Sequence, residues 1–272
     1  MINHSVLIAD SGSTKTDWAW GSNRIHTQGL NPFHQDEDTI RSILRNELLP
    51  NVSPAEVLTI QFYGSGVRPE LEEKMQRLLQ EVFPKATHIE AHGDLLGAAR
   101  ALCGQKEGIA CILGTGSNSC LYDGQNIIKN TPPMGYVLGD EGSGAVLGIR
   151  FLNALYKNRL SDQMRVAFET YAEMSMPQII ARVYRQPMAN RWLASLSAFI
   201  HQHLDDPAVN AIVEQNFIDF IRHNIAPYQR KDLPISAVGS IAYYYQEQLS
   251  RAANHEGYTL GLIMRSPLDS LI

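Results

Sequence analysis

Two short segments rich in glycine, serine and threonine carry the residue types that bind phosphate groups. Residues 10–17 read DSGSTKTD and residues 114–117 read GTGS, and each follows an apolar run typical of a buried strand, at residues 6–9 and 109–113. Glycine permits positive φ and leaves backbone amides unshielded, so amides and hydroxyls can converge on an anion. Each segment alone also fits an ordinary tight turn. Because both occur in one chain, and a similar turn follows at residues 238–240, we expect them to hold a polyphosphate from two sides.

Two aspartates near these segments could serve phosphoryl transfer, which needs a metal ion and a carboxylate beside the attacking hydroxyl. Asp10 ends the first predicted strand, where its side chain could order the water around Mg²⁺. Asp94 lies where a strand at 87–91 gives way to a helix, so its carboxylate could accept a proton as a general base. A helix N-cap is the alternative interpretation of Asp94, and a solvated turn lysine is the alternative for Lys15.

A second unusual stretch, residues 135–144, reads GYVLGDEGSG. Four glycines around two acids indicate backbone pressed close to a ligand, with Asp140 accepting hydrogen bonds from neutral hydroxyls. The alternative is a glycine-rich turn that caps a helix starting near Ser143. Asn31 could likewise contact a ligand or serve only its turn. Three polar residues on one strand face could bind a metal, although an ordinary polar strand face explains them better: His88, Glu90 and His92.

Around these residues the pattern alternates between strands and helices, with a helical stretch from 142 to about 224. The predicted strands are 5–9, 17–20, 24–27, 57–63, 86–91, 109–113, 118–122, 126–129, 235–238 and 258–263. The predicted helices are 36–49, 69–82, 95–102, 145–158, 177–184, 191–203, 208–223 and 241–254.

The first two strands should form an antiparallel hairpin around residues 12–15, unlike a dinucleotide-binding fold, in which the phosphate loop leads into a helix. Strand, small turn and strand recur after residue 108, which we interpret as an internal repeat. We therefore predict two domains, residues 1–103 and residues 104–272, the second with a helical insertion at about 145–230.

Composition narrows the function classes. The 272 residues include 23 basic and 28 acidic ones, for a formal net charge of −5, and no basic cluster suits a nucleic acid. The three cysteines form no C-x-x-C pair, and no apolar run reaches the length of a membrane span. With no signal-peptide pattern at the start, we expect a cytoplasmic protein that binds neither membrane nor nucleic acid. Neither a P-loop nor a G-x-G-x-x-G motif after a strand is present.

The motifs resemble those of one superfamily, which includes sugar kinases, actin and heat-shock chaperones. Residues 10–16 resemble its first phosphate motif, residues 114–117 its second, and residues 238–240 its adenosine motif. Within it, GTGSN at 114–118 and GDEGS at 139–143 are most similar to the N-acetylglucosamine kinases and the related BadF/BadG/BcrA/BcrD-type ATPases. The similarity runs from about residue 5 to residue 265.

The resemblance implies an α/β protein of two RNase H-like domains of the actin and hexokinase type, with ATP and Mg²⁺ bound in the cleft between them. Asp94 matches the catalytic aspartate, and Asp10 is the candidate metal residue. Together with the motifs, the resemblance assigns to ATP the residues Gly12, Ser13, Thr14, Lys15, Thr115, Gly116, Gly239 and Ser240. The resemblance assigns Asn31 and Asp140 to the sugar, and from the motifs we expect Ser117, Asn118 and Gly135 to contact it as well.

The implied activity is ATP-dependent phosphorylation of the primary hydroxyl of an amino sugar, with N-acetylglucosamine as the expected substrate. The family's Gly-Trp-Gly turn is replaced here by Pro133, Met134 and Gly135, which leaves the preference for an acetamido group open. One alternative is an ATPase of the 2-hydroxyacyl-CoA dehydratase activator type, which needs cysteine ligands for an iron–sulfur cluster. Another is a sensor that binds nucleotide and sugar without catalysis. The oligomeric state is open, with a homodimer as one option.

Overall fold

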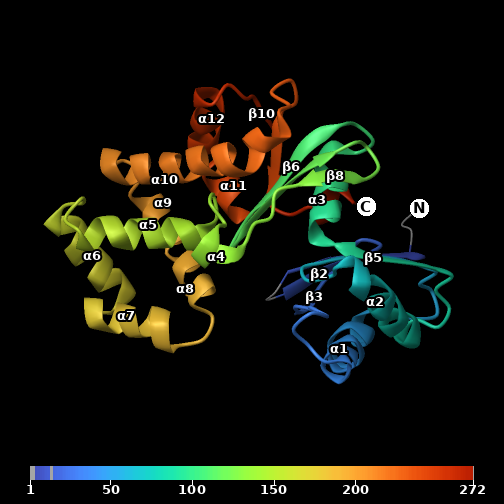
Figure 1. Cartoon of the computed structure of the whole chain (residues 1–272). Coiled ribbons are helices and arrows are strands. Elements are labelled where there is room, and N and C mark those ends of the chain that lie inside the picture. The colour runs from blue at the N-terminus through green and yellow to red at the C-terminus, as the bar shows by residue number, and fades with distance from the viewer. Residues whose placement is uncertain (1–3, 13–14, 272) are drawn as a thin grey trace. The chain divides into compact units, whose positions relative to one another are not determined.

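The computed structural model describes residues 4–12 and 15–271, which form two compact units (Figure 1). The first unit comprises Met1–Gly104 and Pro267–Ile272, and the second comprises Gln105–Ser266. Each is an α/β unit with one five-stranded sheet, as the alternating pattern predicts. The C-terminal residues, expected in the second domain, belong to the first unit, where Leu268 is buried against Ile8 and Tyr63.

The first sheet has the strand order β3-β2-β1-β4-β5. Its strands are β1 (Val6–Ser11), β2 (Lys15–Trp20), β3 (Asn23–Gln28), β4 (Thr59–Gly64) and β5 (His88–Gly93). The predicted hairpin is confirmed, because β1 pairs with β2 antiparallel, and β2 pairs with β3 in the same way. β1, β4 and β5 are parallel, so their carboxyl ends meet at one edge of the sheet.

Helices cover both faces of this sheet. They are α1 (Glu37–Ile43), α2 (Pro69–Val82) and α3 (Asp94–Cys103), with a π-helical turn at Leu44–Leu48 and 3₁₀ turns at Leu49–Asn51 and Leu268–Ser270. α1 and α2 lie on one side and α3 on the other (Figure 1). Because side chains alternate along a strand, Leu7 and Ala9 pack in the core with α1 and α2, whereas Ile8 lies with Tyr63 on the face that carries α3.

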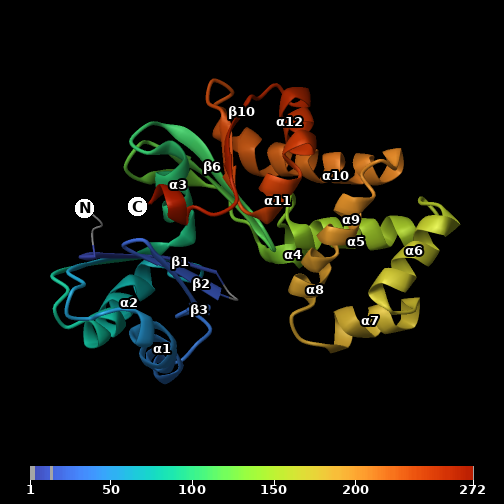
Figure 2. The ribbon, with the colours of Figure 1, turned by 180° about the vertical axis from the view of Figure 1, so that it is seen from behind.

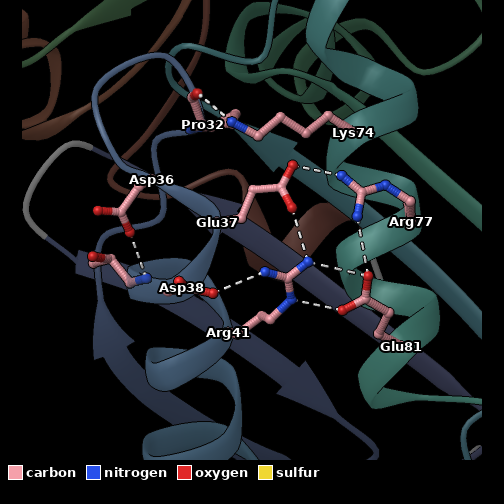
Figure 3. Close-up of polar contacts among 9 residues, drawn as sticks. Pro32, Asp36, Glu37, Asp38, Arg41, Lys74, Arg77 and Glu81 are labelled. Atoms are coloured by element: carbon pink, nitrogen blue, oxygen red, sulfur yellow. Dashed lines mark hydrogen bonds and ion pairs between the residues drawn. The ribbon is translucent and has the colours of Figure 1, made fainter.

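A network of five charged side chains joins α1 to α2 (Figure 3). The Arg41 guanidinium donates to Glu37, Asp38 and Glu81, and Arg77 donates to Glu37 and Glu81. The helix predicted for residues 36–49 is interrupted at Ile43, where the π-helical turn begins, and Asp36 caps α1 by accepting from the Thr39 amide at 2.7 Å. These ion pairs thus join α1 and α2 on one face of the sheet.

The second sheet has the order β10-β9-β6-β7-β8, which repeats the topology of the first. Its strands are β6 (Gly108–Leu113), β7 (Ser117–Tyr122), β8 (Ile127–Asn130), β9 (Ile235–Val238) and β10 (Leu260–Met264). β6, β7 and β8 form an antiparallel meander, and β9 and β10 add to β6 in parallel. The predicted internal repeat is therefore present as two sheets of the same strand order.

The helices of the second unit gather on one side of its sheet (Figure 2). They are α4 (Gly135–Leu138), α5 (Gly144–Tyr156), α6 (Asp162–Ala172), α7 (Met176–Arg185), α8 (Ala189–Ser195), α9 (Ser197–Gln202), α10 (Pro207–Phe220), α11 (Ser240–Tyr244) and α12 (Gln246–His255). A π-helical turn, Ile221–Ile225, and a 3₁₀ turn, Ala226–Tyr228, follow α10. Ile109, Cys111 and Leu113 of β6 face the helical core.

Two predictions about these helices were wrong. The helix expected at 191–203 is two helices, because the Ser195 hydroxyl donates to the Trp192 carbonyl at 2.6 Å and competes with the helical bonds. The helix expected at 241–254 breaks at Tyr245, whose buried ring donates its hydroxyl to the Ser197 carbonyl at 2.5 Å. α4 was not predicted, and α6 lies within the helical stretch expected from residue 142 to about residue 224 without having been delimited as a separate helix. Within residues 4–12 and 15–271, no helix is long and apolar enough to cross a membrane.

Candidate functional site

The carboxyl edge of the first sheet brings Asp10 and Asp94 to one place. In the strand register, Asp10 lies beside Tyr63, and Tyr63 lies beside His92. Asp94 comes two residues after His92, directly beyond the end of β5. Asp10 shares the face of Ile8 and Tyr63, the face that α3 covers, so both carboxylates lie on the same side of this edge.

Asp94 is the first residue of α3 and not its N-cap, a position that Gly93 occupies. Its carboxylate accepts hydrogen bonds from its own amide and from that of Leu95, which lower its pKa. Burial opposes this effect and dominates, so the pKa is raised from 3.8 to about 6. The helix N-terminus thus holds a carboxylate that changes its charge close to neutral pH.

The seat of Asp94 is fixed by close packing of α3 on β4. A Cβ atom at Gly97 would lie 2.7 Å from the Tyr63 ring, so only glycine allows this approach. Farther along the helix, Arg100 donates to the Tyr63 hydroxyl at 2.7 Å and to Glu90 at 2.9 Å. Gly97 thus brings the helix close against the sheet.

Asp10 lies in a group of carboxylates. Its pKa is raised from 3.8 to about 7 by burial first, and then by the charges of Asp94 and Asp17, whereas Lys15 lowers it. Asp17, a residue that the motifs do not mark, pairs with Asp10 across the hairpin and forms an ion pair with Lys15 at 2.8 Å. Its carboxylate also contacts His26 at 2.5 Å.

These acids suit a divalent cation. A cation beside Asp10 would relieve the repulsion from the two neighbouring carboxylates. Among the residues that the structure describes, no three His, Cys, Asp or Glu side chains are grouped to hold a metal on their own. The Asp10 carboxylate fits Mg²⁺, because this ion binds through one or two carboxylates and takes its other ligands from water and phosphate.

The hairpin is held by buried hydroxyls. The Ser11 and Thr16 hydroxyls lie 2.6 Å apart, and both accept from the Leu30 amide. At the turn, the Gly12 amide donates to the Lys15 carbonyl at 2.9 Å. Two predicted phosphate ligands, Ser13 and Thr14, lie outside the described residues.

Asn31 follows this network directly and is buried. Its side-chain oxygen accepts from the amides of Phe33 at 3.0 Å and His34 at 3.2 Å, which is an Asx turn. The carboxamide also lies against Gly66, where a Cβ would be 2.2 Å from the Asn31 oxygen. The turn role is therefore present, and a ligand contact would have to use the amide nitrogen.

In the second unit, the loop between β6 and β7 docks on the start of α5. The carbonyls of Gly114 and Thr115 accept from the amides of Gly144 and Ala145 at 2.8 and 3.2 Å. Gly239 packs against the end of β6, because a Cβ atom added at Gly239 would lie 2.3 Å from the Leu113 carbonyl oxygen. Thr115 is exposed, so its hydroxyl is accessible at the tip of the loop.

Asp140 lies over this loop. Backbone hydrogen bonds from Ser117 and Gly135 lower the pKa of its carboxyl, but burial outweighs them and raises it to about 6. A Cβ atom at Gly116 would lie 3.0 Å from an Asp140 carboxylate oxygen. The residues assigned separately to phosphate and to sugar thus form one group in the second unit.

The other predicted residues have varied surroundings. The Asn118 side-chain oxygen accepts from the Ser119 amide and from Asn130, both at 2.9 Å. Gly135 opens α4 with a φ of 75°, and the exposed Ser240 opens α11 after Gly239. The three polar residues of β5 form pairs, His88 with Glu90, Glu90 with Arg100, and His92 with Glu72.

Comparison with known proteins supports the resemblance of the motifs. Neither the protein-family models nor the curated proteins include a match to the chain. Among solved structures, a candidate N-acetylglucosamine kinase from Porphyromonas gingivalis is 46% identical, with a TM-score of 0.95 over 98% of this chain and 96% of that one. A candidate N-acetylglucosamine kinase from Chromobacterium violaceum is 19% identical, with a TM-score of 0.71 and 94% of each chain covered.

A more distant structure, a candidate N-acetylmannosamine kinase from Listeria monocytogenes, is 13% identical, with a TM-score of 0.51 over 97% of this chain and 94% of that one. The last two similarities concern the fold alone. The similarity to the Porphyromonas gingivalis protein, with 46% identity over nearly the whole chain, shows that the two chains are homologous. The chain therefore belongs to the family of N-acetylglucosamine kinases and related BadF/BadG/BcrA/BcrD-type ATPases, within the superfamily of sugar kinases, actin and heat-shock chaperones.

Proposed function

We propose that this protein is an ATP-dependent kinase that phosphorylates the primary hydroxyl of an amino sugar, with Asp94 as the general base. The observation that carries the proposal is the position of Asp94, a partly buried carboxyl at the start of α3 whose pKa is raised by desolvation to about 6. A base with such a pKa is ionised at neutral pH and still takes up a proton readily. Family membership supports the same reaction class.

In the proposed reaction, the sugar hydroxyl oxygen attacks the terminal phosphorus of ATP. Its proton passes to the Asp94 carboxylate, a new oxygen–phosphorus bond forms, and the bond to the bridging oxygen breaks to leave ADP. When bound, Mg²⁺ neutralises phosphate charge, and Asp10 is the residue that would hold it with its water shell. Positioning and electrostatics supply most of the acceleration in such a transfer.

The remaining assignments belong to the same proposal. We assign phosphate contacts to Gly12, Ser13, Thr14, Lys15, Thr115 and Gly116, and adenosine contacts to Gly239 and Ser240. We assign sugar contacts to Asn31, Ser117, Asn118, Gly135 and Asp140. The buried Asp140 supports its assignment, because a desolvated carboxylate forms strong hydrogen bonds to neutral hydroxyls.

N-acetylglucosamine is the proposed substrate because the Porphyromonas gingivalis protein, 46% identical, is a candidate kinase for that sugar. The decisive experiment is a coupled ADP-release assay with N-acetylglucosamine, glucosamine, N-acetylmuramic acid, N-acetylmannosamine and glucose as separate substrates. The expected result is ADP release that depends on N-acetylglucosamine and on Mg²⁺. Release with another of these sugars would keep the kinase and change the substrate.

Two outcomes would overturn the proposal. Sugar affinity without ADP release would indicate a sensor, and ADP release that ignores every sugar would indicate an ATPase of another kind. The activator-type ATPase needs cysteines that can reach an iron–sulfur cluster. Cys111 and Cys120 are buried on β6 and β7, and Cys103 lies at the end of α3, in the other unit, so the observed positions favour the kinase.

A further inference from the structure

The helix α10 does not end as an ordinary α-helix. After Phe220 the chain continues through the π-helical turn Ile221–Ile225, a rare conformation that is often found at functional sites. Ile221 and Ile225 both remain in the hydrophobic core, and Asn224 is also buried, with 4% of its surface exposed. The wide turn thus keeps its apolar residues packed while a buried polar side chain contacts the segment 131–143.

Asn224 holds both ends of that segment. Its backbone carbonyl accepts from the Thr131 hydroxyl at 2.9 Å and from the Ser119 hydroxyl at 3.3 Å. Its side-chain nitrogen donates to a Glu141 carboxylate oxygen at 3.3 Å, and the neighbouring His223 contacts the other Glu141 oxygen at 3.1 Å. One turn of helix therefore binds the chain before and after residues 133–140.

A second contact comes from Asn216, which lies earlier on α10 and is fully buried. Its side-chain oxygen accepts from the Gly142 amide, and its nitrogen donates to the Ser143 carbonyl, both at 3.2 Å. Gly142 has a φ of 81°, and a Cβ there would lie 2.8 Å from Phe220. Gly142 therefore packs directly against α10, and Asn216 provides hydrogen-bond partners for the Gly142 amide and the Ser143 carbonyl.

Between residues 133 and 140 the backbone closes on itself through a hydrogen bond and contains a strained residue. The Asp140 amide donates to the Pro133 carbonyl at 2.8 Å, and Asp140 adopts a φ of 54°, which is uncommon for a residue other than glycine. Such conformations persist where the surroundings over-determine them. The surroundings here are Glu141, Gly142 and the groups on α10 that hold them.

We propose that Asn216 and Asn224 are positioning residues that hold the Asp140 carboxylate over the loop 114–117 for sugar binding. This inference rests on the proposed function, because Asp140 is taken as a sugar ligand. Neither asparagine touches the loop itself among the contacts of the described chain. Asn216 acts through the backbone of Gly142 and Ser143, and Asn224 acts through the side chain of Glu141.

The test compares Asn216→Ala and Asn224→Ala with Val213→Ala, a buried apolar residue on the same helix about one turn before Asn216. The two asparagine variants should raise the KM for the sugar about tenfold, with the KM for ATP unchanged. Val213→Ala should lower Tm by leaving a cavity and should leave both KM values at the wild-type level. An asparagine variant with wild-type sugar KM, or a Val213 variant that raises it equally, would refute the proposal.

Glu141→Ala keeps the proposal testable if a buried asparagine variant fails to fold, because Glu141 is only partly buried. It should also raise the KM for the sugar, and Glu141→Ala combined with Asn224→Ala should be no worse than either single change. Fully additive effects would mean that the two residues do not act through their contact.

Hydrogen–deuterium exchange separates this inference from the kinase proposal. In Asn216→Ala, the amides of Gly142 and Ser143 should exchange faster, whereas Val213→Ala should leave them protected. If the wild-type protein phosphorylates none of the sugars, the proposed function fails, and unchanged exchange in Asn216→Ala would then refute the positioning role as well.

Discussion

Asp10, near the end of β1, and Asp94, at the start of α3, are coupled carboxyls of the same sheet edge. Burial is the main cause of the raised pKa of Asp10, which reaches about 7, and the negative charge of Asp94 raises it in addition. Burial also raises the pKa of Asp94, to about 6. The two carboxyls are the proposed metal residue and the proposed base, so their protonation links metal binding, catalysis and stability.

The first prediction concerns pH. Both groups bind protons more tightly in the folded chain than in the unfolded one, where their pKa is near 3.8. Their contribution to stability is therefore complete below about pH 4 and is lost as the pH rises towards 7. We expect Asp10→Asn to flatten the fall in the free energy of unfolding across this window, as measured by denaturant titration. An unchanged slope would contradict the raised pKa of Asp10.

Activity should follow the opposite trend, because the proposed base must be ionised. The kcat/KM of the wild-type protein should rise with pH through about 6, the pKa of Asp94. The measurement is a pH profile at saturating Mg²⁺. A profile that is flat from about pH 5 to about pH 8 would exclude control by this carboxyl.

The second prediction tests Asp94 directly. Asp94→Asn keeps the size of the side chain but cannot accept the proton, so kcat should fall at least about 10²-fold. Asp36→Asn is the matched control, because asparagine caps a helix as well as aspartate does and α1 should be retained. Near-normal turnover in Asp94→Asn would remove Asp94 from the role of base.

Much of the fold could be predicted from local patterns. Apolar runs that end in small residues mark β1 and β6, and the short spacing to the next strand requires a hairpin in each case. Helix breaks were missed because Leu196 and Tyr245 are apolar or aromatic residues that fit a continuous periodicity. Hydrogen bonds of single side chains decide where these helices end, a local one from the Ser195 hydroxyl and a tertiary one from the Tyr245 hydroxyl.

The candidate functional site could likewise be predicted only in part from the sequence. Asp17 could have been found, because a hairpin closed by Gly12 and Lys15 pairs Asp10 with Asp17 when residues are counted outward from the turn. The contact between Asp140 and Gly116 could not, since it joins two loops through burial and backbone geometry that no motif records. The anchoring of Glu141 by α10 likewise depends on a π-helical turn that has no local sequence signature.

The third prediction uses the contact between Gly116 and Asp140. A methyl group at Gly116 would lie 3.0 Å from the Asp140 carboxylate, so Gly116→Ala should displace it and raise the KM for the sugar about tenfold. Gly114→Ala is the matched control, because a Cβ there has no described atom within 4 Å. It should leave the sugar KM unchanged. Equal effects of both variants on this KM would show that Asp140 is not the cause.

The fourth prediction concerns the ion pairs between α1 and α2 (Figure 3). Arg41→Gln removes the donor shared by Glu37 and Glu81 and should lower Tm without changing kinetics. The loss should shrink in about 1 M salt, where charges are screened beyond about 3 Å. Arg45→Gln is the control, since Arg45 has no ion pair within the described residues. If the loss of Tm does not change with salt concentration, Arg41 stabilises the two helices by the packing of its aliphatic chain and not by its ion pairs.

The last prediction separates the two roles of Asn31. Its side-chain oxygen accepts from Phe33 and His34, so Asn31→Asp retains the Asx turn but loses the amide donor. If that donor binds the sugar, Asn31→Asp should raise the KM for the sugar by at least about tenfold while Tm changes little. Asn31→Ala should lower Tm as well, because the two backbone amides lose their acceptor. If the KM for the sugar in Asn31→Asp equals the wild-type value, Asn31 serves only the Asx turn. Sugar binding would then depend on the donors and acceptors around Asp140.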